Sequence, residues 1–181
     1  SSVSAMTVSG ACSENSRNVS ITGDITQTAT CSGGSWSASL NISSLAEGTV
    51  SITASHTDAA GNVTTTTART FIKDATAPAI TVTTPSTMQG NVATGSVTWS
   101  LSETNVAAST DFTVEIYNGT AWSSVGTKAA TAGANSATSY NLSNFTVPNF
   151  SSAAAKIRVT LIDAAGNSTT SESGTFTVDS A

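Results

Sequence analysis

The chain contains an internal repeat that restricts the folds it can adopt. Residues 58–62 read Asp-Ala-Ala-Gly-Asn, and residues 163–167 repeat the same five residues. In each copy a Phe follows 13 residues after the first Asp, and a further Asp follows 16 residues after it. Apolar and polar residues alternate before each motif, which is the pattern of a strand with one buried face. Each copy therefore predicts a strand that runs into a turn.

The residues of the motif favour a tight turn for separate physical reasons. An Asp side chain accepts bonds from backbone N–H groups a few residues on, and Gly and Asn tolerate positive φ. A strand rich in Thr and Ser follows each motif and ends at the Phe, so each copy is expected to be a β-hairpin. The residues assigned to the two turns are Asp58, Gly61, Asn62, Asp163, Gly166 and Asn167.

If each hairpin supplies the last strands of a domain, the chain holds two domains of unequal length, residues 1–74 and 75–181. A short joint containing Pro78 follows the first domain, and a new apolar–polar alternation begins at residues 79–83. Residues 2–8 are expected to open the first domain in the place that residues 79–83 take in the second. The pattern predicts an all-β fold with two tandem immunoglobulin-like β-sandwich domains.

The expected strands are short and separated by Gly-, Asn- and Ser-containing turns. In the first domain they lie near residues 3–9, 18–22, 25–30, 35–42, 49–57 and 63–72. In the second domain they lie near residues 79–84, 92–101, 111–117, 121–127, 137–146, 156–162 and 168–178. No stretch keeps a helical period long enough to predict a helix.

The composition limits the classes of function. Lys and Arg number six against eleven Asp and Glu, and the net charge is −5. Nucleic-acid binding depends on clustered Lys and Arg that neutralise phosphates, so no nucleic-acid partner is expected. No apolar run reaches the length of a transmembrane helix, so no membrane insertion is expected in this fragment. Because the chain begins within a strand pattern and without Met, we expect it to be a piece of a longer protein.

Two cysteines, Cys12 and Cys31, lie 19 residues apart in the first domain. In an exported protein an even, locally paired number of Cys predicts one disulfide. Two buried free thiols are the alternative. A zinc-type metal site would need more Cys or His nearby, and the sequence places none there.

The sequence offers little for catalysis. Nucleophilic and acid–base catalysis usually need a base poised near neutral pH, most often His. The only His, His56, lies on an expected strand, where a structural role is favoured over a catalytic one. The carboxylates are scattered along the chain, so no catalytic residue is assigned and no enzyme is expected.

Four segments of the first domain follow one another in a recognisable order. They are residues 34–36 (Gly-Ser-Trp), residues 45–49 (Leu-Ala-Glu-Gly-Thr), the motif at residues 58–62, and the joint at residues 74–78. Together they resemble the bacterial immunoglobulin-like repeats of large surface adhesins and biofilm-associated proteins. The resemblance covers nearly all of the first domain and, in the second, the start and the closing hairpin. The middle of the second domain, residues 99–122, is more similar to a fibronectin type III sandwich.

This resemblance implies a non-catalytic extracellular segment of a bacterial surface adhesin, acting as a structural spacer or an adhesive head. Its partners would be other domains of the same long chain, and its location the bacterial cell surface. An alternative is specific recognition of a carbohydrate or protein by the second domain, which would mediate cell–cell attachment. A further alternative is an accessory module of a secreted hydrolase. Many flanking copies of the repeat would favour a spacer, and a tip position would favour recognition.

The resemblance also raises calcium as a cofactor, because some adhesin arrays of this kind are stiffened by calcium at their domain joints. Ca²⁺ takes six to eight oxygen ligands from carboxylates, carbonyls and water. Asp74 lies at the joint, and Asp58 and Asp163 lie in turns, which makes these three residues the calcium candidates. The alternative is that these Asp residues only stabilise turns, and that the chain binds no metal and no other cofactor.

Three aromatic residues of the second domain are candidates for ligand binding. Trp122 and Tyr117 flank an expected hairpin turn, and Tyr140 follows later in the same domain. Exposed aromatic rings can stack on sugars or anchor a protein partner. The alternative is burial in the core, which is expected for Trp36 and Trp99 because a β-sandwich commonly buries a Trp between its sheets.

Overall fold

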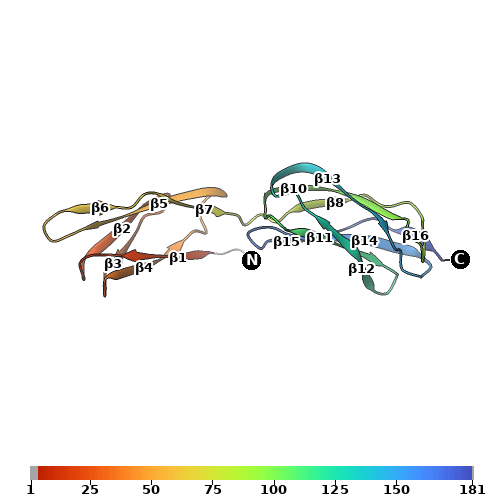
Figure 1. Cartoon of the computed structure of the whole chain (residues 1–181), viewed down its shortest axis with the longest axis horizontal. Coiled ribbons are helices and arrows are strands. Elements are labelled where there is room, and N and C mark those ends of the chain that lie inside the picture. Colours follow the sequence, from red (N-terminus) through yellow and green to blue (C-terminus); the bar gives the residue numbers. More distant parts are fainter. Residues whose placement is uncertain (1–3, 181) are drawn as a thin grey trace. The chain divides into compact units, whose positions relative to one another are not determined.

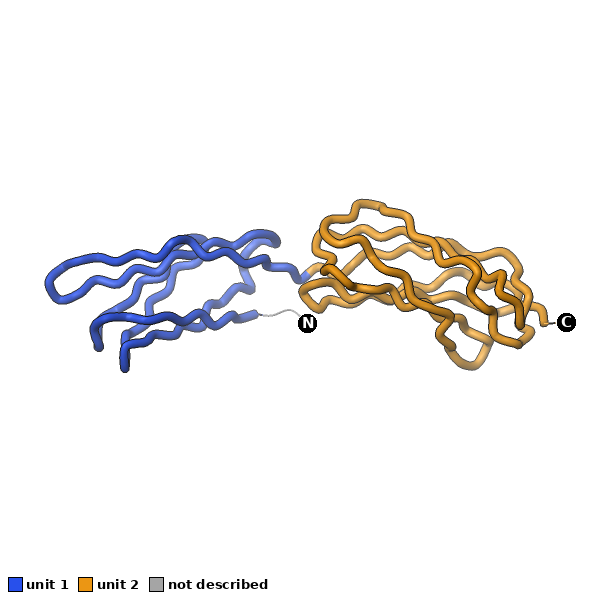
Figure 2. Tube along the Cα trace, in the orientation of Figure 1, with its two compact units in different colours: residues 1–75 blue, residues 76–181 orange. Residues whose placement is uncertain are grey.

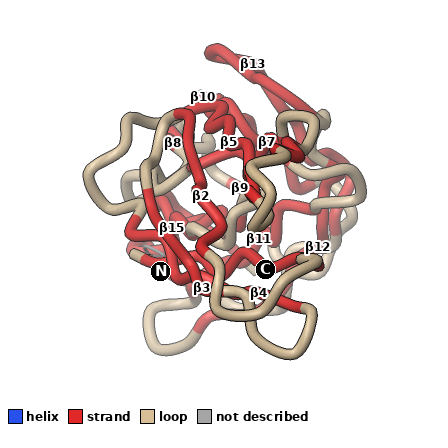
Figure 3. Tube along the Cα trace, turned by 90° about the vertical axis from the view of Figure 1, so that its left-hand side faces the viewer, coloured by secondary structure: helices blue, strands red, loops and turns tan. Residues whose placement is uncertain are grey.

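The computed structural model describes residues 4–180, in which all regular structure is β-strand (Figure 3). This confirms the all-β fold class predicted from the alternating pattern. The chain divides into two compact units, residues 1–75 and 76–181 (Figure 2). Among the described residues no helix is long and apolar enough to cross a lipid bilayer. Val3, where the first strand was expected to begin, lies outside the described residues.

Unit 1 has two sheets. Its strands are β1 (Ala5–Ala11), β2 (Asn18–Gly23), β3 (Gln27–Thr30), β4 (Ser35–Asn41), β5 (Gly48–Thr57), β6 (Val63–Thr65) and β7 (Arg69–Lys73) (Figure 1). Strands β1 and β4 pair with each other, while β3, β2, β5 and β6 form a second sheet in that order, with β7 also paired to β5. All of these pairings are antiparallel.

The core of unit 1 lies between the two sheets. Ala38 and Leu40 of β4 are buried against Ile21 of β2 and Ile52 of β5. The residues between them in the sequence are Ser and Thr with exposed or partly exposed side chains, because successive side chains of a strand point to opposite faces. The period of two in the sequence therefore builds a β-sandwich.

A disulfide joins the two sheets of unit 1 at one end. Cys12 directly follows β1, Cys31 directly follows β3, and their sulfur atoms lie 2.04 Å apart. The Cys12 N–H donates to the carbonyl of Gly34 at 3.0 Å, and the Cys31 N–H donates to the carbonyl of Arg17 at 2.8 Å. The predicted pairing of the two cysteines is confirmed, and the alternative of two free thiols is wrong.

Unit 2 also has two sheets. Its strands are β8 (Ala79–Val82), β9 (Met88–Gln89), β10 (Gly95–Val106), β11 (Asp111–Tyr117), β12 (Trp122–Ala129), β13 (Gly133–Phe145), β14 (Ser152–Ile162), β15 (Ser168–Glu172) and β16 (Phe176–Asp179). One sheet has the order β13, β10, β8, and the other has the order β12, β11, β14, β16, β9, with β15 also paired to β14. The pairing of β9 with β16 is parallel. The short strand β9 was not expected from the sequence.

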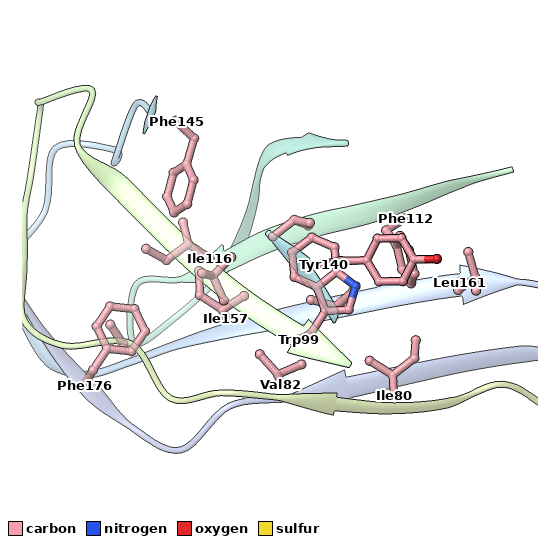
Figure 4. Close-up of a cluster of buried hydrophobic side chains, with 14 of the residues drawn as sticks. Ile80, Val82, Trp99, Phe112, Ile116, Tyr140, Phe145, Ile157, Leu161 and Phe176 are labelled. Atoms are coloured by element: carbon pink, nitrogen blue, oxygen red, sulfur yellow. The ribbon is translucent and has the colours of Figure 1, made fainter. Parts of the chain in front are cut away.

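An aromatic cluster fills the centre of unit 2 (Figure 4). Trp99 of β10 meets Phe112 of β11 edge-on, with ring centroids 5.2 Å apart, and stacks on Tyr140 of β13 at 6.1 Å. The Tyr140 hydroxyl donates to Oδ1 of the buried Asn135 at 2.9 Å, so the polar end of this ring is satisfied inside the core. The cluster joins the two sheets, and it confirms the core position expected for Trp99.

The last expected strand of each domain is in fact two strands. In unit 1, β6 and β7 pair with successive parts of β5, and in unit 2, β15 and β16 pair with successive parts of β14. A hydroxyl group interrupts each ladder: Oγ1 of Thr66 accepts the N–H of Ala54, and Oγ of Ser173 accepts the N–H of Ile157. The single strands expected at residues 63–72 and 168–178 are therefore wrong, because side-chain acceptors replace backbone carbonyls at those points.

The pairing pattern shows which strands of the two units correspond. The hairpin motif equates β5 with β14, and β2 and β11 pair with them in the same way. The pair β1–β4 then matches the pair β10–β13. Strand β1 thus corresponds to β10 and not to β8, contrary to the sequence-based expectation for residues 2–8. Among the described residues, unit 1 has no counterpart of β8 or β9.

The domain bounds 1–74 and 75–181 stay a prediction.

Removing the disulfide should destabilise unit 1. Closing a loop between residues 19 apart lowers the entropy of the unfolded chain, and this is worth about 3 kcal/mol. We expect the double variant Cys12→Ala, Cys31→Ala to lose about that free energy of unfolding in denaturant titrations of unit 1. Reducing the wild type with dithiothreitol should give a similar loss and should leave the variant unchanged. Equal stability of the oxidised and reduced wild type would contradict this account.

Candidate functional site

The two repeated turns have the same hydrogen-bond geometry. In unit 1, Oδ1 of Asp58 accepts the backbone N–H of Asn62 at 2.8 Å and Oδ2 accepts its side-chain amide at 2.7 Å. In unit 2, Oδ1 of Asp163 accepts the backbone N–H of Asn167 at 2.8 Å and Oδ2 accepts its side-chain amide at 2.9 Å. The Gly before each Asn has a φ of +87°, a left-handed conformation that favours Gly. These six residues therefore close the hairpins, as the motif predicts.

The hydrogen bonds that the Asp58 carboxylate accepts lower its pKa. The side-chain amide of Asn62 is the largest influence and lowers the pKa of Asp58 below its ordinary value of 3.8, with the backbone N–H of Asn62 acting in the same direction. Bonds to the charged form of a carboxyl group favour that form. The ionised Asp58 carboxylate is thus the form that holds the turn.

Two buried carboxylates face each other in unit 2. Glu103 near the end of β10 and Asp163 after β14 are each 5% exposed, and a carboxylate oxygen of one lies within 4.8 Å of an oxygen of the other. Oε1 of Glu103 accepts the backbone N–H groups of Thr104 at 2.6 Å and Asn105 at 2.9 Å. Neither acid forms an ion pair within residues 4–180. We call Glu103 and Asp163 the acidic pair.

The sequence identified only one member of the acidic pair. Glu103 continues the alternation of Trp99 and Leu101, both buried, and so faces the core. That alternation was the available signal for it. Of the other two calcium candidates, Asp74 follows β7 in unit 1, and Asp58 lies in the repeated turn of the same unit. Across the described range no group of three acidic, His or Cys side chains gathers around Asp58.

An aromatic and ionic face covers the outer side of the β12–β11–β14 sheet. Trp122 and Tyr117 are cross-strand partners with ring centroids 5.1 Å apart, and the guanidinium of Arg158 lies 4.4 Å from the centre of the Trp122 ring. Nε of Arg158 also bonds Oε2 of Glu115 at 2.5 Å. We call Tyr117, Trp122, Arg158 and Glu115 the aromatic face.

The aromatic face is partly exposed, and charge interactions of Arg158 hold its side chains in place. All four side chains have intermediate exposure. The hydrogen bond that Arg158 donates to Glu115 is the largest influence on the pKa of Arg158 and raises it, although partial burial opposes this effect. A guanidinium over an indole ring is a favourable cation–π contact that also holds the ring in place. Arg158 therefore holds the Trp122 ring on the outer side of the sheet, where the Tyr117 ring lies beside it at an angle of 38°.

Tyr140 does not belong to this face. It is only 7% exposed, it stacks on Trp99 in the core, and its hydroxyl is bonded to Asn135. The sequence-based assignment of Tyr140 to a binding surface is therefore wrong. The reason is that Tyr140 falls on the buried face of β13, and a strand's period places its ring without regard to the loops nearby.

Unit 1 has an open groove at one edge of its sandwich. The groove encloses about 430 Å³ between β1 and β7, and its lining includes Met6, Val8, Gly10, Trp36, Arg69 and Phe71. The indole of Trp36 covers Gly10, where a Cβ atom would come within 2.8 Å of the ring nitrogen. Trp36 was expected in the core, but it is only partly buried and packs against the edge of the core, whereas Trp99 is fully buried. We call this feature the edge groove.

His56 lies in a structural setting. Nδ1 of its ring is 3.3 Å from the carbonyl oxygen of Asn18 on the neighbouring strand β2, and the two residues are on paired strands. Within residues 4–180 no hydroxyl or thiol group is hydrogen-bonded to this ring. His56 therefore contributes to strand pairing.

Comparisons with known proteins give structural likenesses only. No protein-family model and no curated protein matches the sequence. The chain is similar to a tetra-tandem repeat in the extending region of a large adhesion protein, with 21% identity and a TM-score of 0.44. It is also similar to a 1.5-MDa bacterial ice-binding adhesin, studied for its retention on the host cell surface, with 26% identity and a TM-score of 0.47. These matches cover 97% and 98% of this chain but 46% and 58% of the solved chains, so the chain spans about half their length.

The stability of unit 1 should depend on pH through Asp58. The folded-state pKa of this group is lowered, so its contribution is present above the ordinary value of 3.8 and is lost as the pH falls through the lower folded value. We expect Asp58→Asn to lower the melting temperature of unit 1 at pH 7, with the difference from the wild type shrinking below pH 3.8. Thermal melts from pH 7 to pH 2 would measure it.

The matched control for this prediction is Asp111→Asn, which removes an exposed carboxylate from unit 2. It should leave the melting temperature of unit 1 unchanged at every pH. A constant difference between the wild type and Asp58→Asn across the whole pH range would show that the charge on Asp58 plays no part.

Proposed function

We propose that this chain is a non-catalytic extracellular segment of a bacterial surface adhesin, in which the two units serve as a structural spacer or as part of an adhesive head. The observation that carries the proposal is the pair of β-sandwich units closed by the same Asp-Ala-Ala-Gly-Asn hairpin. Repeated modules that each form their own core are the usual way to build a long extended protein. In such a protein the partners of this segment are the other domains of the same chain.

The disulfide and the surface composition support the location outside the cell. Disulfides persist in oxidising compartments and are rare in the bacterial cytosol. The chain holds its one disulfide in unit 1, and only 9% of its residues are charged. Ser and Thr occupy the outward positions of most strands, so the surface stays polar without strong fields that would attract nucleic acid.

A second candidate function is recognition of a glycan or protein by unit 2. The observation that favours it is the aromatic face, where Trp122 is partly exposed and held by Arg158. Aromatic residues and Arg are the residue types that dominate binding energy at protein surfaces. Because Tyr117 and Arg158 already contact the Trp122 ring and reduce the area open to a ligand, this function ranks second.

A glycan array probed with the labelled full chain would separate the two functions. If the chain is a spacer, we expect no glycan to be retained above background by the wild type or by Trp122→Ala. Trp36→Ala, which removes the indole of unit 1, serves as the matched control. Retention of a glycan by the wild type and by Trp36→Ala, but not by Trp122→Ala, would contradict the spacer function and support recognition.

We also propose that unit 2 binds calcium through the acidic pair. Buried carboxylates are costly unless they are paired or coordinate a metal, and within residues 4–180 these two lie side by side with no ion pair to a cationic side chain. Carboxylate oxygens are the ligands that Ca²⁺ prefers. When bound, the ion would neutralise both charges and stiffen the loops that follow β10 and β14, with Glu103 and Asp163 supplying the protein charge.

Calcium should therefore stabilise unit 2 in a thermal melt. We expect 1 mM Ca²⁺ to raise its melting temperature relative to EDTA by roughly 5 °C or more, the shift of a ligand well above its Kd. Glu103→Gln should abolish the difference, whereas Asp58→Asn should keep it because that carboxylate closes a turn in unit 1. Identical melting curves of the wild type in Ca²⁺ and in EDTA would rule out the calcium site.

A further inference from the structure

Unit 1 is an incomplete sandwich when compared with unit 2. In unit 2, β8 pairs with the edge of β10, with Val82 opposite Trp99 and Ile80 opposite Leu101. Strand β9 then pairs in parallel with β16, with Met88 opposite Val178. In the described part of unit 1, the equivalent strands β1 and β7 pair only with β4 and β5. Within residues 4–180 the outer edges of β1 and β7 are therefore unpaired.

The edge groove lies where the missing strands would run. Its walls are β1 and β7, the counterparts of β10 and β16. Phe71 and Phe176 occupy the same place in the repeat, but Phe176 is 6% exposed whereas Phe71 lines the open groove. The inward residues of β1, Met6 and Val8, are likewise only partly buried, whereas Val97 of β10 is 3% exposed. The apolar side chains Met6, Val8 and Phe71 of unit 1 are therefore left partly exposed, whereas their counterparts in unit 2 are buried.

We propose that the edge groove is the docking site of an extended polypeptide strand of the same chain, running ahead of β1, which completes unit 1 as β8 and β9 complete unit 2. An unpaired strand edge beside an apolar groove is the arrangement that strand addition uses: backbone bonds supply affinity, and alternate side chains fill the groove. Leaving such an edge open would invite unwanted pairing with other chains.

The chemistry of the strand follows from β8 and β9. These strands bring Ile80, Val82 and Met88 into the core of unit 2, and residues 77–90 contain no charged side chain. The lining of the edge groove includes one charged residue, Arg69, which forms no ion pair within residues 4–180. The groove therefore has no cluster of charged side chains that would require a strand of opposite charge. A neutral strand with apolar residues at alternate positions fits both features.

The connection in unit 2 indicates why the strand belongs to the same chain. Strand β9 ends at Gln89 and β10 begins at Gly95, so a short loop carries the covering strand directly into the strand it covers. Strand β1 is the counterpart of β10, and by the same connection its covering strand would lie just ahead of it. This inference does not depend on the proposed adhesin function, because it concerns the folding of unit 1 alone.

A graft tests the proposal directly. The sequence of residues 77–90 is fused ahead of Ser1 of the full chain. A control graft has Ser in place of the three residues copied from Ile80, Val82 and Met88. We expect the first graft to raise the melting temperature of unit 1 by about 5 °C or more, and to slow amide exchange along β1 and β7 by at least about tenfold. The control graft should do neither.

A free peptide keeps the test valid if the graft disturbs folding. A synthetic peptide of residues 77–90, added in excess to the ungrafted chain, should slow exchange at the same two edges. No protection of β1 and β7 by the graft or by the peptide would overturn the proposal. Protection by the peptide and not by the graft would overturn the same-chain origin of the strand. Protection of the ungrafted chain that rises with its own concentration would assign the groove to a second copy instead.

Discussion

The fold of both units depends on how one carboxylate fixes the end of one central strand. Strands β5 and β14 pair on both edges, so their register decides the register of the sheets around them. At the end of each strand an Asp binds the backbone and the side chain of an Asn four residues on. Because side chains alternate with a period of two, a slip of one residue would turn Ile157, Val159 and Leu161 from the core to solvent.

What the sequence predicted correctly is what adjacent residues determine. The hairpin turns depend on five consecutive residues, and the alternation of β11 and β14 depends on strand geometry alone, so both could be found without knowledge of the fold. The disulfide could be predicted because only two cysteines are present and an exported context favours their pairing. The all-β class followed from the same local patterns.

The features that the sequence did not reveal depend on distant partners. Strand β9 has only two residues, and it is a strand because β16 lies beside it. The interruptions at Thr66 and Ser173 depend on which backbone N–H group faces each hydroxyl. Tyr140 lies near loop residues in the sequence but is held in the core by Trp99, and Glu103 meets Asp163 only in the folded chain. In each case the decisive contact joins residues that no local pattern connects.

The position of the disulfide has a mechanical consequence for unit 1. Cys12 and Cys31 hold their Cα atoms 6.0 Å apart, although the chain between them would span roughly 65 Å if fully extended. A pulling force applied at the two ends of the chain passes through the sulfur atoms and bypasses β2 and β3. Unit 1 can therefore unravel under tension while these two strands bear no load. Its maximum length under force is set by the redox state of its surroundings.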